Sequence, residues 1–116
     1  MDANTTEALK PFFWVEQQGG RADLCLNAGG FKDEIFDARS DEGFLGNGYD
    51  WQSLARVFLD EKVPHLADDI DFDSEAGMFV ANSDNPAALE QFALGFRAMC
   101  EDDQTMADLF SRAEID

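Results

Sequence analysis

The chain has 116 residues, enough for one domain with a buried core, and its eleven Phe, two Trp and one Tyr exclude a disordered acidic tail. Its 25 acidic side chains oppose eight Lys and Arg and one His, which gives a formal net charge of −17. A net charge of about 2–8 in magnitude is enough to keep a small domain in solution. The excess of negative charge repels nucleic acid and favours a basic protein as the partner.

The N-terminal part of the chain predicts a β-hairpin. We expect residues 1–10, which are polar, to form a frayed segment ahead of a single α+β domain at residues 11–116. The aromatic and β-branched run at 12–17 predicts a strand, and the alternating run at 22–27 predicts a second one. Because a glycine-containing turn joins the two strands, we expect them to pair antiparallel. The second strand directs three residues to one face: Ala22, Leu24 and Leu26.

The middle of the chain predicts two helices around a glycine-rich loop. Residues 31–39 predict a short helix with Ile35 and Phe36 directed inward. The loop at 43–48 leads to Asp50, which occupies the position expected of a helix N-cap. A longer amphipathic helix is then indicated by five apolar residues at the spacing i, i+3, i+4, i+7 and i+8: Trp51, Leu54, Ala55, Phe58 and Leu59.

The C-terminal half predicts a second hairpin, at residues 70–73 and 78–82, followed by two helices. Asn85 and the proline after it predict the start of the first helix, and Asp102 or Asp103 caps the last one. Counted without the short helix at 31–39, the order β-β-α-β-β-α-α indicates an α+β fold in which an antiparallel sheet of about four strands carries helices on one face. The residues expected to face inward from the last two helices are Leu89, Phe92, Ala93, Phe96, Met99, Cys100, Met106, Leu109 and Phe110.

The two cysteines, Cys25 and Cys100, stand far apart in sequence and belong to no CxxC pair. We therefore expect two buried, reduced thiols and no zinc or thioredoxin-like motif. The first residues show no basic patch followed by an apolar stretch, so no secretory signal is predicted. No apolar run approaches the ~20 residues of a membrane span, and the expected location is the cytoplasm.

The alternating acids of residues 69–73 resemble the beginning of an EF-hand loop. The rest of that loop is missing, since Ser74 stands at the sixth position and Val80 at the twelfth. The favoured interpretation is a strand whose aspartates face water while Ile70 and Phe72 face inward. A metal-dependent small regulator that uses the acidic cluster at residues 68–75 remains as an alternative.

The glycine-rich loop also has the geometry of a phosphate loop, but Tyr49 and Asp50 follow its last glycine where Lys-Ser or Lys-Thr would be required. The carboxylate would place negative charge where a phosphate should lie. The only histidine, His65, has no recognisable nucleophile motif nearby. We therefore expect no cofactor and no catalytic residues, and predict a binding protein rather than an enzyme.

Acidic side chains gather at residues 33–42, 68–73 and 101–103. Repulsion among so many like charges destabilises the isolated chain, and a basic partner would offset that cost. Tyr49 and Trp51 are residue types enriched in interfaces, and they flank Asp50 on a predicted loop. The predicted partner-binding residues are Asp37, Asp41, Glu42, Phe44, Tyr49, Asp50 and Trp51.

Four segments of the chain resemble immunity protein family 51 of bacterial polymorphic toxin systems. They are residues 12–16, 26–31, 43–51 and 76–80, and the block Gly-Asn-Gly-Tyr-Asp-Trp within 43–51 is the most specific of them. The resemblance extends roughly from Pro11 to Glu114.

The resemblance implies a small α+β protein that is encoded beside a toxin gene and blocks its cognate toxin domain in the cytoplasm of the producing cell. Many such toxins are basic nucleases, and an acidic inhibitor would cover their nucleic-acid site. The family supplies no catalytic residues to carry over. An acidic adaptor that binds a basic host protein remains as a second interpretation of the charge.

Overall fold

The computed structural model describes residues 2–115. Five α-helices and four strands make up the regular structure, with short 3₁₀ segments between them. In chain order the elements are α1 (Ala3–Leu9), β1 (Phe13–Glu16), η1 (Gln18–Gly20), β2 (Ala22–Asn27), α2 (Asp33–Asp37), η2 (Ser40–Glu42), α3 (Gly48–Lys62), η3 (Pro64–Asp69), β3 (Asp71–Phe72), β4 (Met78–Ser83), α4 (Pro86–Cys100) and α5 (Asp103–Phe110).

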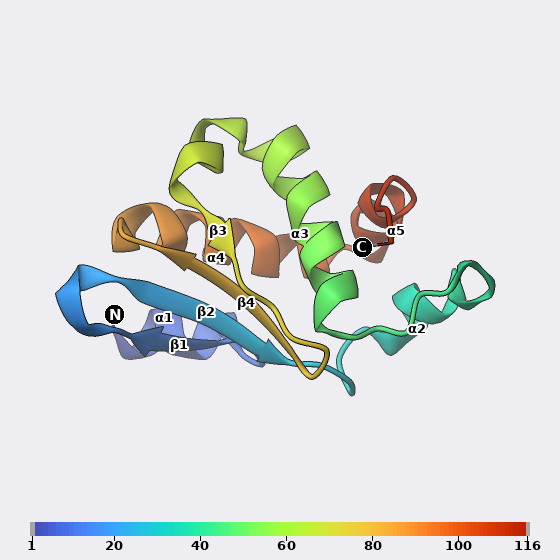
Figure 1. The fold of residues 1–116 in the computed structure, drawn as a ribbon, viewed down its shortest axis with the longest axis horizontal. Helices are drawn as coiled ribbons and strands as arrows, with labels where there is room; N and C mark the ends of the chain where they lie inside the picture. Colours follow the sequence, from blue (N-terminus) through green and yellow to red (C-terminus); the bar gives the residue numbers. More distant parts are fainter. Residues whose placement is uncertain (1, 116) are drawn as a thin grey trace.

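The four strands form one antiparallel sheet in the order β1-β2-β4-β3. Leu24 lies opposite Trp14 on one side and opposite Ala81 on the other, and these residues share one face of the sheet. The helices lie on that face, with α1 and α4 behind the sheet and α3 packed against β4 (Figure 1). The predicted α+β fold, with four antiparallel strands and helices on one face, is confirmed.

Strand β2 has the predicted bounds and the predicted inward face. Ala22, Leu24 and Leu26 are each no more than 2 % exposed and belong to the main hydrophobic core. The same core takes up the predicted inward residues of α4 and α5, all of which are buried. Strand alternation and helical periodicity therefore place the core correctly from the sequence.

Helix α1 and the start of α3 differ from the expectations. Residues 1–10 were expected to fray, whereas Ala3–Leu9 form a helix that is capped by the Asp2 side chain and ends in Leu9, only 1 % exposed. The N-cap of α3 is Asn47 rather than Asp50, because Gly48 is already helical. Local side-chain caps from Asp2 and Asn47 begin these helices, and tertiary contacts of Leu9 and Gly48 add to them.

Trp51 lies at the centre of the core, in a cluster of aromatic rings. Its ring makes contacts with centroid separations of 5.0 to 6.1 Å, edge-on, tilted or stacked, with four phenylalanines: Phe12, Phe31, Phe36 and Phe96. Such pairs add about 0.5–1.5 kcal/mol each beyond the burial of their area. Within residues 2–115, no helix is both long and apolar enough to cross a bilayer.

Candidate partner-binding surface

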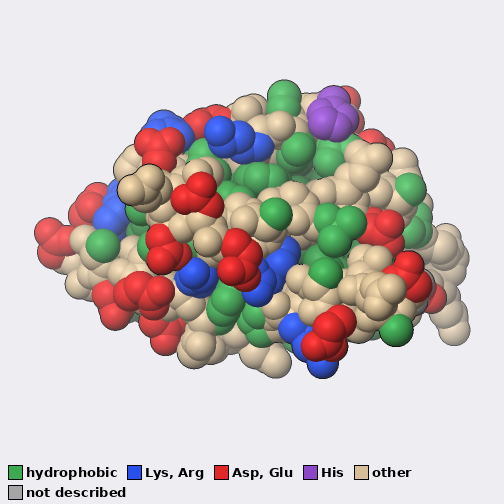
Figure 2. Space-filling model, turned by 180° about the vertical axis from the view of Figure 1, so that it is seen from behind, with side chains coloured by type: hydrophobic (Ala, Val, Ile, Leu, Met, Phe, Trp, Pro, Cys, Tyr) green, Lys and Arg blue, Asp and Glu red, His purple; other side chains and the backbone are tan. Residues whose placement is uncertain are grey.

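Residues 33–42, which comprise α2 and η2 and are called here the acidic lobe, project from one end of the molecule (Figure 1). All five of its carboxylate side chains are exposed: Asp33, Glu34, Asp37, Asp41 and Glu42. The view from the helix side shows acidic side chains crowded at this same end (Figure 2). The lobe is therefore a concentrated source of negative potential.

Arg39 anchors the acidic lobe to the C-terminal part of the chain. Its Nε and one terminal nitrogen each donate to Glu42 at 2.8 Å, and its other terminal nitrogen donates to the carbonyl oxygen of Ala113 at 2.9 Å. The guanidinium also lies over the rings of Phe44 and Phe110, 4.4 and 5.0 Å from their centroids. One side chain thus joins the lobe to the end of the chain by charge, hydrogen bonds and cation–π contact.

The five carboxylates of the lobe do not all have the same role. Hydrogen bonds from Arg39 lower the pKa of Glu42, so this group is occupied within the protein. The Asp33 carboxylate accepts from the backbone N–H of Gly30 at 2.9 Å. Glu34, Asp37 and Asp41 have no ion pair with any described residue, which makes these three the carboxylates most available to a partner.

Three predicted partner-binding residues are buried, which corrects the prediction for them. Phe44 is 2 % exposed, Asp50 is 5 % exposed and Trp51 is 1 % exposed. The ring of Phe44 packs against Phe110 at 4.7 Å, and Trp51 fills the centre of the core. A partner cannot contact these three side chains in this conformation, because the fold has already removed them from water.

Asp50 has a structural task in the loop that leads into α3. Its carboxylate accepts from the backbone N–H groups of Leu45 at 2.6 Å and Gly46 at 2.8 Å. The side chain of Asn47 accepts in return from the N–H of Asp50 at 2.9 Å, and the two residues form a capping box. The carboxylate of Asp50, between Tyr49 and Trp51 in the sequence, therefore stabilises the loop and is not free to bind a partner.

Gly48 allows α3 to approach the hairpin between β3 and β4. Its N–H donates to the carbonyl oxygen of Ala76 at 2.9 Å. A Cβ added at this position would lie 1.9 Å from the carbonyl oxygen of Glu75 and 2.5 Å from that of Met78. Only glycine fits here, because both obstructing atoms belong to the backbone.

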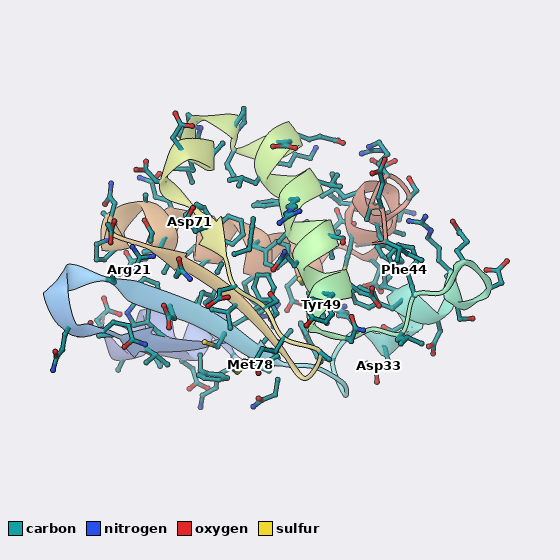
Figure 3. The ribbon with its side chains drawn as sticks, in the orientation of Figure 1. Arg21, Asp33, Phe44, Tyr49, Asp71 and Met78 are labelled. Carbon is teal, nitrogen blue, oxygen red and sulfur yellow. The ribbon has the colours of Figure 1, made fainter. Side chains whose placement is uncertain are left out.

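The Gly-Asn-Gly-Tyr-Asp-Trp block is thus mainly structural, and Tyr49 is its exception. Tyr49 is 43 % exposed on the first turn of α3, and Figure 3 shows it on the side of the molecule that faces away from the helix layer behind the sheet. The preceding loop exposes Leu45 to 80 %, the largest fraction among the exposed large apolar side chains of residues 2–115. Sequence reasoning missed Leu45, since neither helical nor strand periodicity applies to a loop residue.

The remaining sequence signals give no second site. Among residues 2–115, no three His, Cys, Asp or Glu side chains converge as a metal ion would require, so the acidic cluster at 68–75 has no geometric support as a metal centre. His65 is exposed on η3. Both cysteines are free and buried, as predicted, and burial raises the pKa of Cys25 to about 11 and that of Cys100 to about 12.

Comparison with known proteins relates nearly the whole chain to one family. The family model described as Immunity protein 51 matches residues 12–115. No curated protein and no solved structure matches the chain. The match covers the sheet, the acidic lobe, α3, α4 and α5, so it concerns the same domain whose surface is described above.

Proposed function

This chain belongs to the Immunity protein 51 family, and we propose that it binds a cognate bacterial toxin domain and neutralises it by stoichiometric occlusion. We further propose that the toxin domain is basic, with a nuclease as the leading candidate, and that the acidic lobe covers its active-site cleft. The observation that carries this proposal is the set of exposed lobe carboxylates without an ion pair among the described residues, Glu34, Asp37 and Asp41, followed along the chain by the exposed side chains of Leu45 and Tyr49.

The lobe and its neighbouring apolar side chains have separate roles in this binding. The carboxylates steer the basic partner and raise the association rate, an effect that salt screens over a Debye length of about 8–10 Å. Tyr49 supplies a rigid ring with a polar tip at low entropy cost, which suits an anchor of the interface. We therefore expect added salt to weaken binding mainly through slower association.

A survival assay tests the function itself. The toxin domain encoded beside this gene is expressed in a sensitive bacterium, and colonies are counted with and without this chain. We expect the toxin domain to kill the cells and this chain to rescue them. Toxicity without rescue, at good expression of this chain, would contradict the pairing and favour the acidic adaptor.

A charge-reversal experiment tests the acidic lobe. The double variant Asp37→Lys/Asp41→Lys leaves Glu42 and its bonds to Arg39 intact, and the control Asp68→Lys/Asp69→Lys makes the same charge change on exposed residues of η3. We expect the lobe variant to slow association with the toxin domain at low salt by about tenfold or more, and the control by much less. Equal effects of the two variants would show that only net charge matters.

A further inference from the structure

The sheet has a second face that no helix covers, called here the open face (Figure 1). Strand register and alternation assign its side chains, because residues opposite one another on neighbouring strands point to the same side. Phe13 lies opposite Cys25, which lies opposite Val80, and Val15 lies opposite Asp23, which lies opposite Asn82. The open face is made up of Phe13, Val15, Asp23, Cys25, Asn27, Asp71, Met78, Val80 and Asn82.

The β1 side of the open face is apolar. Phe13 is 38 % exposed and Val15 is 37 % exposed on β1, and both are among the few large apolar side chains that the fold leaves in water. Cys25 and Val80 lie next to them on the central strands, outside the main core cluster, and are only 4 % and 8 % exposed, so Phe13 and Val15 supply the apolar surface that water reaches. A sheet face in contact with water normally carries polar side chains, so this composition needs a reason beyond folding.

The rest of the open face carries acidic side chains. Asp23 lies on the central strand β2 between Val15 and Asn82. Asp71 lies on the edge strand β3 with a terminal nitrogen of Arg21 4.0 Å away, and Asp73 follows β3 directly. The strand positions of the open face carry no lysine or arginine, and the guanidinium of Arg21 at its end is bound to Asp84 and to the side-chain oxygen of Asn82 at 2.7 Å. The face therefore presents an apolar strip along β1 next to acidic side chains on β2 and β3.

A pocket adjoins this face at the β1 edge of the sheet. Its volume is about 530 Å³, and Phe13 belongs both to its wall and to the open face. The other lining residues come from α1, from the segment that leads into β1 and from β1 itself: Thr6, Leu9, Lys10, Pro11, Phe12 and Trp14. Pockets of this kind receive the anchor side chains that dominate interface energy.

The open face is also close to the candidate partner-binding surface. Gly48 donates its N–H to Ala76 in the β3–β4 hairpin, and Tyr49 is the next residue. Figure 3 shows Arg21, Asp71, Met78 and Tyr49 on the side of the molecule that faces the viewer. One partner can therefore reach the open face and the first turn of α3 together.

The charge of the chain decides what occupies this face. A second copy would bring another net charge of −17 against the same acidic side chains, which like-charge repulsion opposes. A basic surface with an apolar protrusion complements both the acidic side chains and the apolar strip. We propose that the open face is the apolar half of the toxin-binding interface and that the pocket beside β1 receives an apolar side chain of the toxin domain, an inference that rests on the proposed function.

The test compares apolar side chains of similar exposure on the two sides of the molecule. The variant Phe13→Thr/Val15→Thr places β-branched residues at both positions of β1 and removes most of the exposed apolar surface of the open face. The control Leu94→Gln changes a side chain that is 40 % exposed on α4, in the helix layer. Binding of the cognate toxin domain is measured by calorimetry, and circular dichroism confirms that each variant is folded.

We expect the open-face variant to weaken binding by at least about tenfold, through faster dissociation, and Leu94→Gln to leave it unchanged. Affinity within about twofold of the wild type for the open-face variant, while Asp37→Lys/Asp41→Lys still slows association, would overturn this inference and leave the proposed function standing. A dimer in sedimentation that the open-face variant dissociates would make a second copy the occupant and overturn it too. A wild-type chain that neither binds nor rescues would overturn both proposals.

Discussion

The covered and open faces of the sheet are formed by the same four strands but differ in what packs against them. On β4, Phe79 and Ala81 are fully buried in the main core, whereas Val80 and Met78 point to the side without helices. The covered face is complete within the chain, since aromatic rings from several helices close over it. The open face exposes apolar side chains that the fold does not use, and the proposed partner would complete it.

The largest expected difference between the faces is in stability, measured on two phenylalanines. Phe79→Ala opens a cavity under a side chain that is 0 % exposed, and we expect it to lower the free energy of unfolding by about 4 kcal/mol. Phe13→Ala removes a side chain that is 38 % exposed, and we expect a loss of about 1 kcal/mol or less. Urea denaturation measures both. Similar losses would mean that the open face contributes to the core of the domain.

A second prediction concerns the margin of the sheet, where α3 meets the hairpin. We expect Gly48→Ala to destabilise the domain by about 3 kcal/mol, because the new Cβ would lie 1.9 Å from the carbonyl oxygen of Glu75. Gly77→Ala is the matched control, since a Cβ there would meet no atom within 4 Å and its φ is not positive. Thermal unfolding distinguishes them. A mild effect of Gly48→Ala would show that the close approach is dispensable.

Asp50 and Asp41 provide a third comparison, between a carboxylate used by the fold and one left for a partner. Asp50→Ala removes the acceptor of two backbone N–H groups and half of a capping box, and we expect a loss of about 2 kcal/mol of unfolding free energy. Asp41→Ala lies on the exposed acidic lobe, and we expect a change of about 0.5 kcal/mol or less. Equal losses would contradict the assignment of Asp50 to structure.

The smallest expected effect concerns the two thiols. Desolvation, with the nearby charge of Asp23, raises the pKa of Cys25 to about 11, and desolvation raises that of Cys100 to about 12. Because a raised pKa keeps the thiol protonated, both cysteines should react very slowly with a disulfide reagent at pH 8 until the protein is unfolded in urea. Cys25 on the open face should be the faster of the two. Rapid reaction of Cys100 in the native protein would contradict its place in the core.

Much of the fold follows from patterns in the sequence, but the helix ends do not. The alternation at residues 22–27 and the stripe from Leu89 to Cys100 are long enough for periodicity to define their buried faces. Helix α1 is short and polar, and it is held by Leu9 in the core, a contact that no local pattern reveals. The start of α3 depends on Gly48 fitting against a hairpin about thirty residues away in the chain.

The candidate surface was harder to predict than the fold. Trp51 fits the helical spacing of buried apolar residues and is also a residue type enriched in interfaces. In the structure it lies in the core. Exposed carboxylates such as Asp37 and Asp41 could be named from the sequence, but the capture of Glu42 by Arg39 could not. The open face was missed because the aromatic run at 12–17 lacks the alternation that would assign its two sides.

The most direct test of the account is the footprint of the cognate toxin domain on this chain, measured by amide hydrogen exchange in the free protein and in the complex. The account predicts slower exchange in the acidic lobe, in the loop through Leu45 to the first turn of α3, and in β1, whose Phe13 and Val15 belong to the open face. Protection confined to η3, α4 and α5, with the acidic lobe and β1 unchanged, would contradict it.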